Sequence, residues 1–220
     1  MKPYYGSLHE MRAFKRITSL LALHWGALLG VRSALVTAAF VFVLFVTAIA
    51  FVIGLRDVNR ALSAAWLSLL PSVYVLYFIV TAKDEDRRDA FRALGFSRAY
   101  DLTQASVMMV ALLPIELFWC GTSLYLGGTL EKAFIQLLVM ILFSSASLGA
   151  LISARRLVSP YRLPQHLYVL ISGPWNLISM LFALSATESV VRNESCSVQL
   201  LALGFMTAWW GVQTAISREG

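Results

Sequence analysis

Long apolar blocks separated by short polar connections occupy most of the chain. Six blocks are 20 to 25 residues long, and a helix of that length covers roughly 30 to 37 Å, enough to cross the hydrocarbon core of a bilayer. A helix also satisfies its own backbone hydrogen bonds in lipid, and the blocks lack the alternation typical of barrel strands. The pattern therefore predicts an all-α polytopic membrane protein with six transmembrane helices, at Ala34–Leu55, Ala61–Ala82, Thr103–Gly127, Ala133–Ala154, Leu167–Ala186 and Val198–Ser217.

A different pattern precedes the first block, over residues 8–31. Apolar side chains at helical spacing share one face there: Phe14, Ile17, Leu21, Trp25 and Leu28. Arg12, Lys15 and Arg16 gather on the opposite face. This arrangement is typical of an amphipathic helix lying in the membrane interface, with its cations among the headgroups. The alternative is a long start to the first transmembrane helix, which Gly26 and Arg32 would interrupt.

Composition supports the membrane interpretation. Hydrophobic residues make up 59% of the 220 residues and charged residues 14%, against about 45–50% and 25% in soluble domains. No soluble domain is apparent between the blocks, so residues 1–220 are predicted to form a single transmembrane domain. The two cysteines, Cys120 and Cys196, are too few for a disulfide framework.

The net charge of +6 could indicate a nucleic-acid partner, but the positions of the basic residues favour another explanation. With six crossings, fourteen of the eighteen Lys and Arg residues fall on the side of the termini, and four fall on the opposite side: Arg56, Arg60, Lys132 and Arg192. Positive residues concentrate on the cytoplasmic side of membrane proteins. Both termini are therefore predicted to be cytoplasmic, and no nucleic acid is expected as a partner.

The stretch KDEDRRDAFRALGFSRAYD, from Lys83 to Asp101, carries ten charges in nineteen residues. Three acidic residues open it, where they favour a helix N-terminus, and Gly95 is placed to end that helix. Ser97 can then cap a new helix that runs into the third block. So short a helix is not stable alone in water, which predicts docking on another surface. A solvated, positively charged loop is the alternative.

This layout resembles the permease subunits of type 2 ABC exporters. In that family the second span is followed by an acidic-basic run, a short helix and a small turn before a Ser-Arg pair. The corresponding residues here are Asp86-Arg87-Arg88, Phe91 to Leu94 and Gly95-Phe96-Ser97-Arg98. The family often has a proline in the turn, where this chain has Gly95-Phe96.

The resemblance implies a multi-pass subunit of the bacterial cytoplasmic membrane that is not itself an enzyme. A coupling hairpin at residues 84–97 would dock on a separate ABC ATPase that binds ATP and Mg, through Arg87, Arg88, Phe91, Arg92, Leu94, Phe96 and Arg98. The chain itself contains no GxxxxGK[ST] loop for phosphates, and no cofactor is expected on it. A second permease subunit, identical or different, would complete the pathway. The cargo would be amphipathic, lipid-linked, peptide or drug-like, and would move outward from the inner leaflet.

Several polar or aromatic residues within the blocks are candidates for a pathway. Glu116 lies deep in the third block and must be protonated, paired or facing a polar route, because an ionised carboxylate there is costly. Asn176, in SGPWN, follows a helix breaker that makes either a binding site or a packing bend. Trp209 and Trp210 could serve an interface belt, packing or an aromatic surface toward a lipid-like cargo. The run SSASLGA, Ser144 to Ala150, predicts close helix packing.

Two other functions stay open on the sequence alone. One is a membrane enzyme acting on a lipid or peptide, with Glu116 or His166 as acid or base. The other is a scaffold subunit of a larger membrane complex. An ATPase that associates through the charged stretch would discriminate against both.

Overall fold

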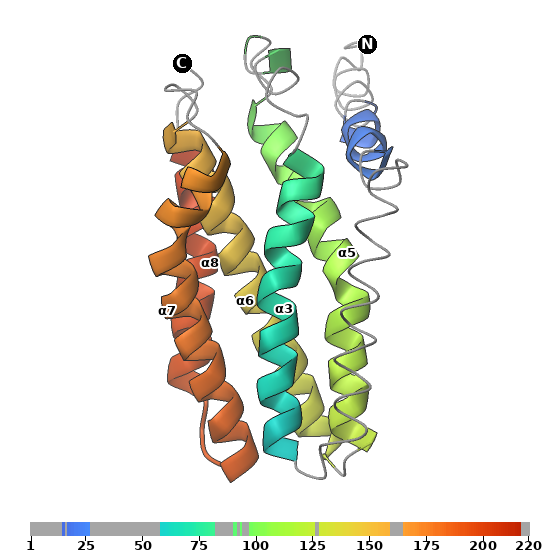
Figure 1. The fold of residues 1–220 in the computed structure, drawn as a ribbon, viewed down its shortest axis with the longest axis vertical. Helices are drawn as coiled ribbons and strands as arrows, with labels where there is room; N and C mark the ends of the chain where they lie inside the picture. Colours follow the sequence, from blue (N-terminus) through green and yellow to red (C-terminus); the bar gives the residue numbers. More distant parts are fainter. Residues whose placement is uncertain are drawn as a thin grey trace, which may run out of the picture.

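The computed structural model describes residues 15, 17–26, 58–81, 90, 91, 93, 97–125, 128–158 and 165–216. Long helices dominate this part of the chain and run side by side in an elongated bundle (Figure 1). The all-α prediction is confirmed for these residues, whereas the predicted span Ala34–Leu55 lies outside them. The long helices are α3 (Val58–Thr81), α5 (Ser97–Tyr125), α6 (Leu130–Val158), α7 (Gln165–Arg192) and α8 (Ser197–Ile216).

Three of the helices are long and apolar enough to cross a membrane, among the residues that the structure describes. They are Arg98–Tyr125, Leu130–Arg156 and Leu170–Arg192, and they match the third, fourth and fifth predicted spans. Helices α3 and α8, of 24 and 20 residues, overlap the second and sixth predicted spans. Within the part of α3 whose side chains the structure describes, Ser68–Phe78 is a continuous apolar stretch.

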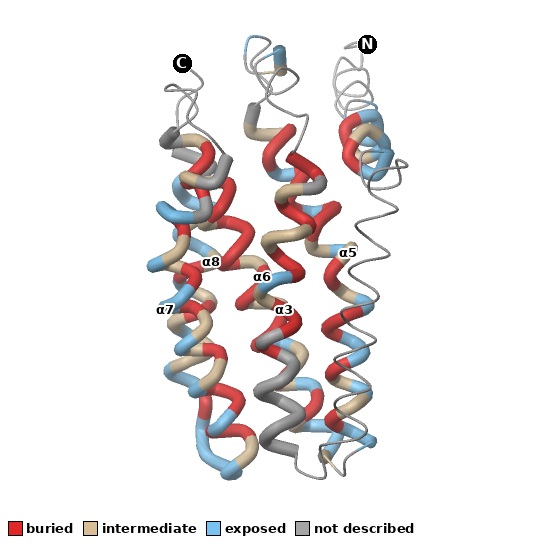
Figure 2. The backbone as a smooth tube through the Cα atoms, in the orientation of Figure 1, coloured by how far each residue is buried: buried red, intermediate tan, exposed pale blue. Residues whose placement is uncertain are grey.

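Helix α6 occupies the centre of the bundle. It packs against α3, α5, α7 and α8, and along much of its length its residues are buried (Figure 2). Small side chains such as Ala146, Ser147 and Gly149 allow neighbouring helices to come close to its backbone. The close packing predicted for the run Ser144 to Ala150 is thus confirmed.

The interior of the bundle is mainly apolar but also contains polar residues, and large apolar residues are exposed on the outside. Buried polar side chains include Ser68, Gln104, Gln136 and Ser179. Soluble monomers rarely expose large contiguous apolar patches, whereas lipid-facing helices do so along their length. The outer surfaces of α5, α7 and α8 accordingly carry Leu117, Phe118, Leu177, Leu181, Leu201 and Phe205, all of them exposed.

Helix α7 extends further than the sequence predicted. The fifth predicted span ends at Ala186, which left residues 187–197 as a connection, but α7 continues to Arg192. Thr187 is buried and accepts a hydrogen bond from Trp66 Nε1 at 3.1 Å, so contacts with α3 favour helix where local composition indicated a loop.

Asn193 ends α7 in the left-handed region, with φ of 60°. The Asn193 N–H donates to the carbonyl of Val190, and the Glu194 N–H donates to that of Ser189 at 2.8 Å. These two bonds make a Schellman motif, which satisfies carbonyls at the helix end.

Prolines interrupt the backbone hydrogen bonds of three helices without ending them. Pro114 lies inside α5 and Pro174 inside α7, and Pro71 lies inside α3. Neighbouring helices can stabilise such positions in a bundle. The breaker in SGPWN therefore does not divide α7 into two half-helices.

Candidate functional site

Glu116 makes a buried hydrogen bond between α5 and α6. Ser144 Oγ donates to Glu116 Oε1 at 2.7 Å, and both side chains are fully buried. Ser144 is the middle residue of α6 (Leu130–Val158), so the carboxyl group lies at mid-height in the bundle. Its other oxygen, Oε2, is buried with no hydrogen-bond partner among the described residues. Of the arrangements that the sequence allowed for Glu116, the structure thus shows a paired carboxyl group.

The Glu116–Ser144 pair is expected to couple the stabilities of α5 and α6. Ser144→Ala should lower the free energy of unfolding by about 0.6 kcal/mol, the mean for interhelical hydrogen bonds in membranes. It should cost nearly nothing in a Glu116→Leu background, while Glu116→Gln should preserve the bond because its amide oxygen still accepts. Detergent-induced unfolding followed by circular dichroism measures the double-mutant cycle; additive effects would contradict the pairing.

Asn176 faces α3. Its Nδ2 donates to the hydroxyl of Tyr74, while its backbone carbonyl accepts from Ser179 Oγ at 2.9 Å. Trp119 in α5 makes a similar interhelical contact, donating from Nε1 to Ser68 Oγ at 2.9 Å. Together these bonds join α3 to α5 and α7. Glu116 and Asn176 thus both lie in the packed interior, and their role in a pathway stays a prediction.

Tyr100, in the first turn of α5, contacts two segments from outside the long helices. Its ring stacks on Phe91 of the charged stretch, with centroids 5.1 Å apart and an interplanar angle of 28°. The ring of His24 meets Tyr100 edge-on, with centroids 4.6 Å apart. His24 lies in the helical residues 17–26, the described part of the predicted amphipathic helix. We call Tyr100, Phe91 and His24 the Tyr100 cluster.

An ion pair adjoins the Tyr100 cluster. Arg156 Nε, near the end of α6, donates to Asp101 Oδ2 at 2.6 Å. Asp101 is 1% exposed and the Arg156 side chain 18% exposed. Since Asp101 directly follows Tyr100, the pair ties the start of α5, and with it the Tyr100 cluster, to the central helix.

The predicted ATPase-docking residues lie mostly outside the described residues. This applies to Arg87, Arg88, Arg92, Leu94 and Phe96. Phe91 is half-buried against Tyr100, and Arg98 is half-buried in the first turn of α5. The structure describes α5 from Ser97 onward, which agrees with the new helix that the sequence predicts there, whereas the capping role of Ser97 stays a prediction. The docking role of these residues stays a prediction.

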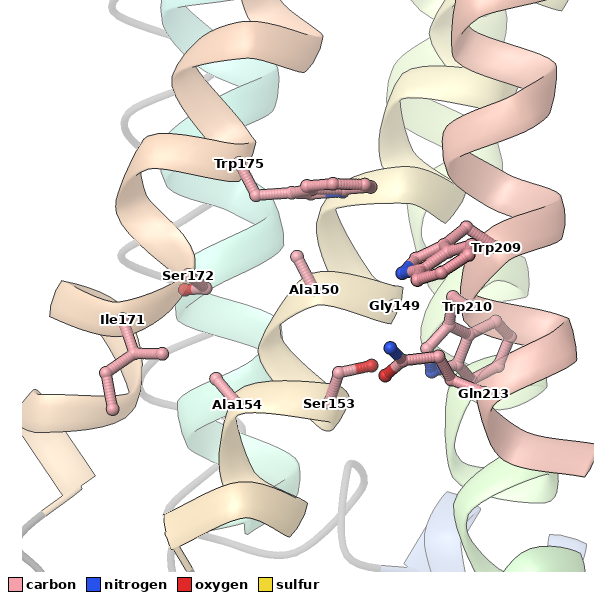
Figure 3. A pocket seen from close by; sticks show the side chains of 10 residues that line it. All are labelled: Gly149, Ala150, Ser153, Ala154, Ile171, Ser172, Trp175, Trp209, Trp210 and Gln213. Carbon is pink, nitrogen blue, oxygen red and sulfur yellow. The ribbon is translucent and has the colours of Figure 1, made fainter. Parts of the chain in front are cut away.

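A groove between α6, α7 and α8 is a feature that the sequence did not predict as a site. Its volume is about 170 Å³ and it is partly open. Trp175 from α7 and Trp209 from α8 stand on either side of Ala150, and the polar ends of Ser153 and Gln213 face each other near one end (Figure 3). We call it the tryptophan groove. Trp175 directly precedes Asn176, so the sequence singled out the neighbouring position, which faces α3 instead.

Trp210 packs onto the backbone of α6 beside the groove. A Cβ atom at Gly149 would lie 2.6 Å from Trp210 Cγ and 2.8 Å from its Cβ, so only glycine fits at this point of contact. Adjacent tryptophans in α8 therefore have different positions: Trp210 is half-buried against α6, whereas Trp209 is 46% exposed. Of the alternatives that the sequence left open, packing describes Trp210, whereas the exposure of Trp209 fits both an interface belt and an aromatic surface toward a cargo, and that choice stays a prediction.

Comparison of the chain with protein-family models, curated proteins and solved structures finds no match. Function is accordingly inferred from the residues and contacts of this chain.

Proposed function

We propose that this protein is the transmembrane permease subunit of an ATP-driven exporter, of the kind formed by type 2 ABC permeases. In this proposal a separate ATPase docks on the charged stretch, and its nucleotide-driven movement reorients the helices to move an amphipathic molecule outward. The observation that carries the proposal is the Tyr100 cluster, which connects the charged stretch to the long helices.

The contacts provide a mechanical route from the charged stretch into the bundle. A displacement of the segment around Phe91 would act on Tyr100 by ring stacking and on residues 17–26 through His24. It would also reach α6 through the Asp101–Arg156 ion pair. Packed side chains and buried ion pairs of this kind can transmit a displacement between rigid helices. An unattached, solvated loop would lack this route.

The proposal includes six membrane crossings, with α3 and α8 spanning beside α5, α6 and α7. At about 1.5 Å per residue, the 24 and 20 residues of α3 and α8 cover roughly 36 and 30 Å. The predicted span Ala34–Leu55 would supply the first crossing. Arg98, Arg155 and Arg156 lie at the end where α5 begins and α6 ends, which favours a cytoplasmic position for that end in a bacterial inner membrane.

The partners follow from the same proposal. A half-pathway of six helices requires a second permease subunit, either a copy of this chain or a different one, and membrane lipids surround both. ATP and Mg would bind to the ATPase, and this subunit would have no catalytic role of its own.

An acid–base site made by Glu116 and His166 is less compatible with the helix positions. Glu116 lies nineteen residues beyond the start of α5, or about 28 Å along the helix axis. His166 belongs to the first turn of α7, which begins at the same end of the bundle (Figure 1). Direct proton transfer needs groups within hydrogen-bond reach, so this separation argues against joint acid–base catalysis by the two residues.

Replacing Phe91 and Leu94 together with aspartate is expected to abolish co-purification of the ATPase and the ATP hydrolysis that accompanies it. Two carboxylates would put charge on the apolar surface that docking requires. ATPase activity of the purified complex measures the effect. Ala93→Asp is the matched control, because Ala93 is exposed in the same segment and one more charge there should be tolerated.

A second variant separates docking from transmission. Tyr100→Leu removes the stacking partner of Phe91 but leaves the charged stretch intact, so the ATPase should still bind while its activity no longer responds to cargo. If the Phe91/Leu94 double variant retains full ATPase binding, the coupling proposal is wrong. A stable complex with a protein that does not hydrolyse ATP would favour the scaffold function.

A further inference from the structure

The walls of the tryptophan groove offer two aromatic faces over a floor of small residues. Trp175 and Trp209 come from different helices, and between them α6 presents Gly149 and Ala150 (Figure 3). Trp210 is held against Gly149 by close contact, so this boundary of the groove is firm. A slot with indole walls suits a flat ring system, because aromatic rings stack face to face or edge to face over large contact areas.

The size of the groove limits how much of a ligand it can hold. Its volume of about 170 Å³ is close to that of an apolar cavity of ~150 Å³ that binds benzene, and smaller than the ~300–1,000 Å³ of sites that enclose a whole drug-sized molecule. The groove is partly open, so the remainder of a larger molecule can extend outward between α7 and α8.

The polar groups in the groove are uncharged. Ser153, Ser172 and Gln213 contribute hydroxyl and amide groups, and among the residues that the structure describes no Asp, Glu, Lys, Arg or His lines this groove. Hydroxyl and amide groups both donate and accept hydrogen bonds. A charged ligand would lose its hydration without gaining an opposite charge, which is strongly unfavourable. The lining therefore selects for an uncharged molecule with a hydrogen-bonding group.

The polar groups also orient the ligand. Ser153 lies one turn beyond Ala150 toward the end of α6, and Gln213 lies one turn beyond Trp209 toward the end of α8. Both helices end where α5 begins, the end that the proposed topology places in the cytoplasm. A ligand would thus direct its hydrogen-bonding group toward that end and its ring toward the middle of the bundle.

We propose that the tryptophan groove binds the flat aromatic ring of an uncharged amphipathic molecule, with its hydrogen-bonding group at Ser153 and Gln213. As a site for transported cargo it rests on the proposed function, and it narrows the cargo from amphipathic molecules in general to neutral aromatic ones. Binding itself requires no ATPase, so the two proposals can fail separately.

Photolabelling of the chain alone, in lipid nanodiscs, tests the site. The probe is 1-azidoanthracene, a flat uncharged ring, and peptide mass spectrometry maps where it reacts. We expect saturable labelling of groove residues on α7 and α8, displaced by excess 1-aminoanthracene and not by anionic anthracene-1-sulfonate. Displacement by added short-chain phosphatidylcholine would assign the groove to ordinary lipid and overturn the proposal.

Two variants and a matched control test whether the probe binds in the tryptophan groove. Ala150→Leu fills the space between the tryptophans and should abolish groove labelling, whereas Ala208→Leu makes the same change at an exposed residue of α8 outside the lining and should preserve it. Trp175→Leu keeps apolar volume but removes one aromatic wall, so the affinity should fall about three- to tenfold. Circular dichroism verifies that each variant is folded.

Labelling spread evenly over the exposed apolar surface, or unchanged in Ala150→Leu and Trp175→Leu, would also overturn the proposal. Groove labelling that survives while the Phe91/Leu94 variant still binds its ATPase would leave the ligand site standing and reject the coupling proposal alone.

Discussion

Gly149→Ala is expected to destabilise the bundle by about 1–3 kcal/mol, the usual cost of overpacking a well-packed interior. The added methyl group would overlap Cγ and Cβ of Trp210 at 2.6 and 2.8 Å. These atoms are at the base of the indole side chain, so rotating the ring does not relieve the overlap and α8 must move away from α6. Detergent-induced unfolding followed by circular dichroism measures the change.

Gly204→Ala in α8 is the matched control. A Cβ at Gly204 meets no heavy atom within 4 Å, so alanine should raise stability there by up to about 0.5–1 kcal/mol through its better helix propensity. We therefore expect Gly149→Ala to lower the free energy of unfolding and Gly204→Ala to raise it. In a Trp210→Ala background the Gly149→Ala change should become nearly neutral; a cost that persists there would contradict the role of Trp210.

Asp101→Ala is expected to lower the free energy of unfolding by about 2–3 kcal/mol, because it removes the carboxylate that the buried ion pair provides to the Arg156 guanidinium. The value lies below the usual range for fully buried pairs, since the Arg156 side chain is 18% exposed and retains some hydration. Asp101→Asn keeps an oxygen that can accept from Arg156 Nε and should cost less. Chemical unfolding measures the free energy of unfolding, which we expect to be highest in the unchanged protein, lower in Asp101→Asn and lowest in Asp101→Ala.

The ion pair between Glu188 and Arg192 provides the control. Their side chains are 63% and 62% exposed, and the two residues are one turn apart on α7. Exposed pairs of this kind contribute about 0.3–0.5 kcal/mol, so Glu188→Ala should have little effect. If Asp101→Ala costs no more than Glu188→Ala, burial does not strengthen the Asp101–Arg156 pair. ATPase stimulation in Asp101→Ala, measured in the same samples, reports whether the Tyr100 cluster depends on this pair.

Local sequence signals predicted the start of α5 but not the end of α7. Ser97 after Gly95 is a local start signal, and the structure describes α5 from Ser97 onward. The polar run from Thr187 onward indicated a loop, but α7 continues to Arg192 because Thr187 is buried and bonded to Trp66, 121 residues earlier in the chain. A contact between residues so far apart in the sequence cannot be predicted from the composition around either of them.

In the candidate sites, too, some residues could be recognised from the sequence, whereas their contacts could not. Glu116 could be recognised in the sequence because a carboxyl group within an apolar block must be protonated, paired or facing a polar route, but its partner Ser144 is on another helix. Tyr100 gave no local signal, since its contacts with Phe91 and His24 depend on how three segments meet. The tryptophan groove was likewise hidden, because Trp175 and Trp209 lie on different helices.

The order of apolar and polar residues determined by itself that this chain forms long apolar helices, approximately where they lie in the sequence, and that a charged stretch separates two of them. These properties follow from helix length and from local hydrogen bonding, which neighbouring residues control. Only the tertiary structure decided that α6 lies at the centre, that Asp101 pairs with Arg156, and which tryptophan packs and which lines a groove. Those outcomes depend on the rotation and spacing of helices about their axes, which are set by side chains that meet across the bundle.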